Sequence, residues 1–201
     1  MALSVLLGQF PDHLPLLSQA AKTQLDVAKK ADAADKAVLM DEVVVAADRV
    51  IAAVDAAEIA LALGVRASDE DDQAALGARK KAEEKRDALV DALACKAAGT
   101  LEGAMAEEQK AEAAVAVYKE LSKWTDSAAA KHAELRAAVE SARGRPAVAL
   151  KALGEHIKEE QPGRDVHERR VALMEDLGWE HIALMERERI AARFPEGDKL
   201  M

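Results

Sequence analysis

A run that could bind zinc lies near the C-terminal end of the chain, at His167-Glu168-Arg169-Arg170-Val171. It begins like the motif of helical zinc peptidases. That motif needs a second histidine four residues after the first, because two imidazoles must share one helix face to bind the same ion. Position 171 is valine, so the second ligand is missing. The run therefore predicts a polar, solvated first turn of a helix and no metal site.

A second candidate is the acidic run from Asp69 to Asp72, whose carboxylates could bind calcium. A calcium loop of the EF-hand type needs glycine at its sixth position and glutamate at its twelfth. Counted from Asp69, those positions hold Ala74 and Lys80. The run is therefore interpreted as a solvated start of a helix, where carboxylates are favoured near the positive end of the helix dipole.

Nucleophilic chemistry has no sequence support either. None of the six serines follows a glycine by two positions, so the nucleophile-elbow pattern is absent. No histidine precedes a glycine, and no Gly-Thr-Ser occurs, although both are typical of a subtilisin-type Ser-His-Asp triad. Cys95 lies on the apolar stretch of an alanine-rich helix, which favours a small buried hydrophobe over a nucleophile. The sequence predicts no catalytic, cofactor-binding or metal-binding residue, and hence no cofactor.

The elements that would position any site are predicted to be helices throughout. The 201 residues include 46 alanines, while aromatic residues make up only 2% of the chain. Apolar residues recur at three- and four-residue spacing, including the Val43–Val45 cluster, which lies inside a helical stripe. The expected helices span about 10–28, 39–54, 73–105, 107–124, 126–141, 147–160, 165–177 and 179–194.

Short links between these helices predict an all-α fold of stacked antiparallel hairpins. The stretch from Gly144 to Pro162 resembles the second helix of a tetratricopeptide unit. Such units repeat about every 34 residues, and no clean repeat with this period occurs elsewhere in the sequence. The expected fold is thus a degenerate, solenoid-like array. It divides into a long-helix region at residues 1–105 and a helical-hairpin bundle at residues 106–201.

Two kinds of residue are expected to anchor this bundle. Large aromatic side chains would fill space that alanine leaves empty, and glycines would end helices in the left-handed conformation. Both tryptophans are interpreted as core residues, the alternative being exposed interface hot spots. The predicted structural anchors are Tyr118, Trp124, Gly144, Gly178, Trp179 and Phe194.

Charge and hydropathy limit the partners. The formal net charge of −9 comes with no basic stripe and no interleaved aromatics, so nucleic acid is not expected to bind. The most apolar stretch, 43–54, is interrupted by charge and falls short of the roughly 20 residues that cross a bilayer. The N-terminus lacks the basic region and cleavage site of a signal peptide, which predicts a cytoplasmic protein.

Four segments together carry a family resemblance, strongest from about Met105 to Pro195. They are Tyr118–Asp126, Gly144–Lys151, Leu173–His181 with its Leu-Gly-Trp-Glu-His element, and Arg193–Pro195. They resemble the C-terminal end of the tripeptidyl peptidase II family, which comprises giant subtilisin-like serine exopeptidases of the eukaryotic cytosol. The resemblance implies a parent protein that removes tripeptides from the N-termini of oligopeptides and works as a large homo-oligomer.

The resemblance transfers no catalytic residue, because the family's Asp-His-Ser triad belongs to an N-terminal domain that has no counterpart in this sequence. The chain is therefore expected to be a non-catalytic helical domain with a structural or assembly role. Its expected partners are the remainder of the protease chain and neighbouring subunits. The alternative is a stand-alone helical-repeat adaptor that binds a protein partner.

Overall fold

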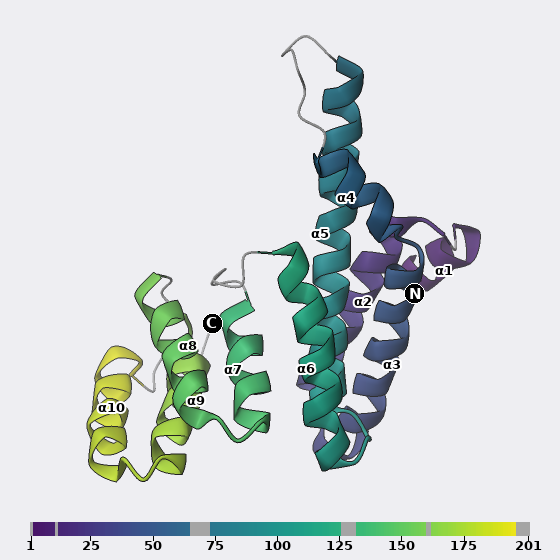
Figure 1. Ribbon diagram of the computed structural model, residues 1–201. Helices are drawn as coiled ribbons and strands as arrows, with labels where there is room; N and C mark the ends of the chain where they lie inside the picture. Colours follow the sequence, from purple (N-terminus) through teal and green to yellow (C-terminus); the bar gives the residue numbers. More distant parts are fainter. Residues whose placement is uncertain (1, 11, 65–72, 126–131, 160–161, 196–201) are drawn as a thin grey trace. The chain divides into compact units, whose positions relative to one another are not determined.

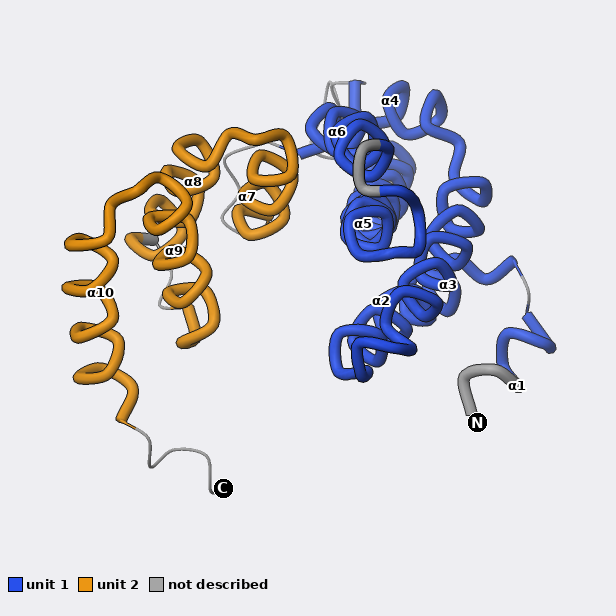
Figure 2. Tube along the Cα trace, turned by 90° about the horizontal axis from the view of Figure 1, so that it is seen from below, with its two compact units in different colours: residues 1–125 blue, residues 126–201 orange. Residues whose placement is uncertain are grey.

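The chain folds entirely into helices over the part that can be described. The computed structural model describes residues 2–10, 12–64, 73–125, 132–159 and 162–195. Those residues form ten helices and no strand (Figure 1), which confirms the predicted all-α array. They fall into two compact units, Met1–Thr125 and Asp126–Met201 (Figure 2). In the described residues no helix is both long and apolar enough to cross a membrane.

The first unit is built around its longest helix, α5. Helices α2, α3, α4 and α6 all pack against α5, and α2 also packs along α3. At 1.5 Å per residue, α5 with its 30 residues is about 45 Å long. The helices of this unit are α1 (Ala2–Gln9), α2 (Leu14–Lys30), α3 (Ala33–Ala52), α4 (Ala56–Gly64), α5 (Gln73–Glu102) and α6 (Glu107–Trp124).

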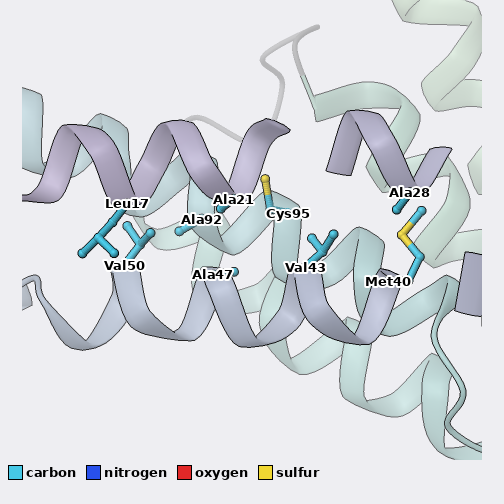
Figure 3. Close-up of a cluster of buried hydrophobic side chains, with 9 residues drawn as sticks. All are labelled: Leu17, Ala21, Ala28, Met40, Val43, Ala47, Val50, Ala92 and Cys95. Atoms are coloured by element: carbon cyan, nitrogen blue, oxygen red, sulfur yellow. The ribbon is translucent and has the colours of Figure 1, made fainter. Parts of the chain in front are cut away.

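The core of this unit lies between α2, α3 and α5 and consists largely of small side chains. Figure 3 shows Leu17 of α2 close to Val50 of α3, with Ala92 of α5 near them and Cys95 of α5 further along, near Ala21 of α2. Small residues let helix backbones approach closely, so the few larger side chains suffice to fill the space. The buried cluster comprises Leu17, Ala21, Ala28, Met40, Val43, Ala47, Val50, Ala92 and Cys95.

Helices α3 and α5 approach each other closely at Gly99 of α5. A Cβ atom at this position would lie 2.8 Å from the carbonyl oxygen of Met40 and 2.9 Å from Cγ2 of Val44, both in α3. Such separations are shorter than van der Waals contact, so α3 and α5 can pack at this distance only around a glycine. One turn further on, the backbone N–H of Ala104 donates to Asp41 Oδ1 of α3 at 3.2 Å, which ties the end of α5 to α3.

Ion pairs flank this core. Lys22 Nζ of α2 lies 2.5 Å from Asp91 Oδ2 of α5, and Lys96 Nζ of α5 lies 2.6 Å from Asp48 Oδ1 of α3. Exposed pairs of this kind contribute at most about 1 kcal/mol each. Their main effect is to favour one register of the helices over others.

The second unit is a series of antiparallel helices in which each packs against the next. Its helices are α7 (Ala133–Ala142), α8 (Pro146–Glu159), α9 (Arg164–Asp176) and α10 (Glu180–Arg193). Ala149 and Leu153 of α8 are fully buried against α7 and α9, whereas Val171 and Met174 of α9 pack against α10. The two inner helices are covered on two sides, and α10 has α9 as its described neighbour.

Glycines end two helices of this unit, as the sequence predicts. Gly144 and Gly178 have backbone φ angles of +70° and +72°. Residues other than glycine rarely adopt such angles, because their Cβ atom would clash with the backbone. After α9, the N–H of Gly178 donates to the carbonyl of Glu175, and the N–H of Trp179 donates to that of Met174, both at 2.8 Å. This pair of bonds is a Schellman motif, which satisfies the last carbonyls of the helix.

Two helices of the fold, α1 and α4, are not predicted by the sequence pattern. The sequence of α1 is apolar and has no polar face that would indicate an amphipathic helix. Helix α4 buries only Ile59, so its sequence shows no apolar stripe. Helix α6 packs along α5 and belongs to the first compact unit, Met1–Thr125, and the division into regions at residues 105 and 106 stays a prediction. The expected start of the next helix, at Asp126, lies outside the described residues.

Candidate functional site

Of the two runs considered as metal sites, the structure describes the one that begins at His167 and not the acidic run 69–72. Among the described residues, no three His, Cys, Asp or Glu side chains gather closely enough to hold an ion. The prediction of a solvated helix start is wrong for His167, which is buried in α9 because it faces α10.

Cys95 is a buried core residue, as predicted. It is 4% exposed and lies between α2, α3 and α5. Burial raises the pKa of its thiol to about 11, and the nearby Asp91 carboxylate acts in the same direction. The thiolate is the reactive form of cysteine, so at neutral pH this side chain is an inert apolar group.

The most unusual arrangement of titratable groups lies between α9 and α10. His167 and Arg170 are three residues apart, so both lie on the face of α9 that meets Glu186 of α10. Arg170 Nη1 donates to Glu186 Oε1 at 2.6 Å, and Arg189 Nη1 approaches Glu186 Oε2 at 3.5 Å. His167 Nδ1 is 3.9 Å from Glu186 Oε1. We call these four residues the α9–α10 polar cluster.

An aromatic contact covers one side of this cluster. The ring of Phe194, just past the end of α10, lies 5.6 Å from the His167 ring between centroids. The guanidinium carbon of Arg193 lies 5.4 Å from the centre of the Phe194 ring, within the range of a cation–π contact. Phe194 therefore connects the end of α10 to α9, which agrees with the anchor role predicted for it but does not test that role.

Burial is the main influence on the titration of His167. It lowers the pKa of the imidazole, and the charges of Arg193 and Arg170 lower it further, while Glu186 opposes them. The ring is therefore neutral near pH 7. The single carboxylate of the cluster is bound by guanidinium groups, and no hydroxyl or thiol belongs to the cluster. This arrangement suits the joining of two helices rather than acid–base or nucleophilic chemistry.

A second polar contact joins three helices of the same unit. Glu134 of α7 accepts a hydrogen bond from Arg169 Nη1 of α9 at 3.0 Å. The buried His156 of α8 places Nε2 3.9 Å from the other carboxylate oxygen of Glu134. These two sets of polar contacts thus lie between helices of the unit, where they favour one alignment of successive helices.

Helix α10 carries apolar side chains on its solvent-facing sides as well as on its packed face. Ala183 and Ile190 are buried against α9. Ile182, Leu184 and Met185 are nevertheless 49%, 54% and 44% exposed. Exposed apolar side chains that are neighbours on one helix can mark a surface that another protein covers. This outer surface of α10, together with Trp179, is the strongest candidate for an interaction surface in the second unit.

The interpretation of Trp179 as a core residue is wrong. Its side chain is 45% exposed, because it lies at the N-cap of α10, directly after the Gly178 turn and outside the packed helix faces. Trp124, Tyr118 and Phe194 are partly buried. Whether these aromatic residues and the two helix-ending glycines stabilise the bundle stays a prediction.

Each unit has a surface groove among its described residues. The groove between α4 and α5 has a volume of about 450 Å³ and is lined mainly by alanine and glycine, with Lys81 and Lys85 at its edge. The groove between α9 and α10 has a volume of about 370 Å³, with the apolar Val171 and Ile190 among its lining residues. Ion pairs occupy the edge of the second groove, including Arg187 Nη2 to Glu175 Oε1 at 2.5 Å.

The α9–α10 polar cluster was not recognised in the sequence. Glu186 occupies a buried position of α10, in line with Ala183 and Ile190, and this apolar spacing is a signal that could have identified it. The pairing of Glu186 with Arg170 and His167 could not have been read from either helix alone, because it depends on the register of one helix against the other.

The fold and these contacts define an alanine-rich, all-α chain in whose second unit the buried residues His156, His167 and Glu186 lie at helix–helix junctions. The chain is 33% identical over 195 residues to tripeptidyl-peptidase 2 of Oryza sativa subsp. japonica, and 32% identical over 201 residues to tripeptidyl-peptidase 2 of Arabidopsis thaliana. It therefore matches a region of tripeptidyl-peptidase 2, which confirms the resemblance seen in the sequence.

These matches cover most of this chain and a small part of the relatives. They include 93% and 94% of the chain, which spans only 14% of the length of each relative. No protein-family model matches the sequence. No solved structure matches the fold.

Proposed function

We propose that this chain is a non-catalytic helical part of a serine-type tripeptidyl peptidase, in which it supports the structure and assembly of the whole enzyme. The parent enzyme would release tripeptides from the N-termini of oligopeptides in the cytosol and act as a homo-oligomer. The partners of this chain would be the remaining parts of the peptidase and neighbouring subunits. The match to a 14% share of two peptidases supports a role as one part of a larger protein.

The observation that carries the proposal is the exposed apolar surface of α10. Ile182 and Met185 are three residues apart, so they are neighbours on the surface of α10, and they are 49% and 44% exposed whereas Ala183 and Ile190 are buried. Contact with another protein surface would remove these side chains from water at a gain of about 25 cal/mol per Å². The unit therefore has a surface suited to packing and no described set of residues suited to peptide hydrolysis.

A chimera tests this proposal directly. The matched region of the Arabidopsis peptidase is deleted in one protein and replaced by this chain in another. We expect the deletion to lose the native sedimentation coefficient and most tripeptide-releasing activity, and the replacement to restore part of both. A deletion protein that keeps both its size and its activity would contradict the proposal and favour the stand-alone adaptor.

Substitutions within the chimera test the surface. Ile182→Glu with Met185→Glu should abolish the restoration, because two carboxylates would be buried without partners. Val148→Glu is the matched control, since Val148 is also exposed but lies on α8 of the same unit. Circular dichroism of each isolated chain establishes that the substituted chains still fold.

A further inference from the structure

His167 brings a titratable ring into a joint between two helices that already contains several cations. The ring is 5% exposed and packs between α9 and the end of α10. Its Nε2 atom is buried and has no hydrogen-bond partner among the described residues. A buried imidazole in this state is tolerated because it is neutral.

The charges around His167 are unbalanced. Arg170 comes from its own helix, and Arg193 comes from the end of α10. Glu186 of α10 is the carboxylate that faces the ring, but its Oε1 already accepts the short bond from Arg170, and its Oε2 is approached by Arg189. A proton added to His167 would therefore create another cation beside a carboxylate whose charge is already compensated.

We infer that His167 makes the α9–α10 joint sensitive to acid, so that proton uptake by this ring releases α10 from α9. Release would uncover Ala183 and Ile190, the buried face of α10, and would break the contact between Phe194 and the imidazole. The inference concerns the isolated chain and does not depend on the proposed role in a peptidase.

The direction of the pH dependence follows from the linkage between proton binding and folding. The pKa of His167 is lower in the folded protein than the ordinary histidine value of about 6.5. The released state therefore binds the proton more readily than the packed state. The joint keeps its full stability above the ordinary histidine pKa and loses stability as the pH falls below it toward the lowered folded value.

The test uses the full chain in solution and two nuclear magnetic resonance measurements. One follows the imidazole signals of His167 with pH. The other follows hydrogen exchange of the α10 amides at pH 7.5 and pH 5.5, after correction for the intrinsic pH dependence of exchange. We expect His167 to titrate below the ordinary histidine pKa and the opening of α10 to increase several-fold at the lower pH.

Three variants make the result specific. His167→Phe keeps an aromatic ring but cannot take up a proton, so its α10 opening should not change with pH. Arg193→Gln removes one neighbouring cation and should raise the pKa of His167. This second variant tests the inference even if His167→Phe does not fold. His181→Gln removes an exposed histidine of α10 and should behave as the unchanged protein does.

Two results would overturn the inference. One is a His167 that titrates at or above the ordinary histidine pKa. The other is an α10 whose opening is independent of pH, or changes equally in the chain with phenylalanine at position 167.

Discussion

At the scale of single residues, Gly99 shows a conflict between helix propensity and packing. In the middle of an isolated helix, alanine is more stable than glycine, by about 0.5–1 kcal/mol. At Gly99, however, the added methyl group would meet the backbone carbonyl of Met40, which belongs to the hydrogen-bonded ladder of α3 and cannot move by itself. Packing should outweigh propensity at this position.

We therefore predict that Gly99→Ala lowers the free energy of unfolding by about 1–3 kcal/mol, the usual cost of overpacking a core. Gly77→Ala is the control, because Gly77 lies in the same helix with nothing within 4 Å of the added atom. It should raise the free energy of unfolding by about 0.5–1 kcal/mol. Urea unfolding of both variants measures the difference, and equal effects at the two sites would contradict this account of the α3–α5 contact.

Trp179 is the residue for which sequence reasoning failed most clearly. A large aromatic side chain among alanine and leucine usually fills a core, but Trp179 is nearly half exposed at the turn before α10. Composition around a residue does not say whether its side chain points toward the core or lies at a turn. The glycines at 144 and 178 were easier to interpret, because the left-handed conformation at a helix end is a local property of the backbone.

At the scale of elements, Glu186 decides how α9 and α10 are joined. Its carboxylate is 9% exposed and contacts the guanidinium groups of Arg170 and Arg189. Removing the negative charge of Glu186 would leave the positive charge of the partly buried Arg170 without its carboxylate partner. We predict that Glu186→Gln lowers the free energy of unfolding by about 1–3 kcal/mol.

Glu188→Gln provides the comparison for this prediction, because Glu188 is an exposed residue of the same helix. The same change in charge there should alter the free energy of unfolding by less than about 0.5 kcal/mol. Thermal unfolding, monitored by circular dichroism, compares the stability of the Glu186→Gln and Glu188→Gln variants. A similar loss in both variants would mean that overall charge, and not the α9–α10 polar cluster, is responsible.

Most helices could be predicted because their apolar spacing and their ends are local features. The bounds expected for α5, α6, α8, α9 and α10 differ from those observed by only a few residues. The short α4 could not be predicted, since one buried residue makes no stripe. Contacts between helices, such as Asp41 with Ala104 or Glu186 with His167, depend on register and distance in space, which spacing along one helix does not determine.

At the scale of the whole molecule, the position of α6 determines where the chain can be divided. Ala114 and Leu121 of α6 are fully buried, and the helix packs against α5. A fragment of residues 1–105 would lack these contacts, whereas residues 1–125 would keep them. We predict that the longer fragment unfolds cooperatively, with a free energy of unfolding at least about 2 kcal/mol above that of the shorter one.

Denaturant titration of the two fragments measures this difference. The complementary fragments, residues 106–201 and 126–201, should show similar unfolding midpoints, because the helices α7 to α10 form a compact unit of their own. If the fragment of residues 1–105 is as stable as that of residues 1–125, the boundary belongs near residue 105, where the sequence places it.

The two tryptophans are divided between the units, with Trp124 at the end of α6 in the first and Trp179 before α10 in the second. The chain contains no others. Fluorescence of the unmodified protein is therefore the sum of one signal from each unit. Replacing either tryptophan by phenylalanine leaves an emission that reports on a single unit. Unfolding of the two units can thus be observed separately in the intact chain, without attaching a dye to the buried Cys95.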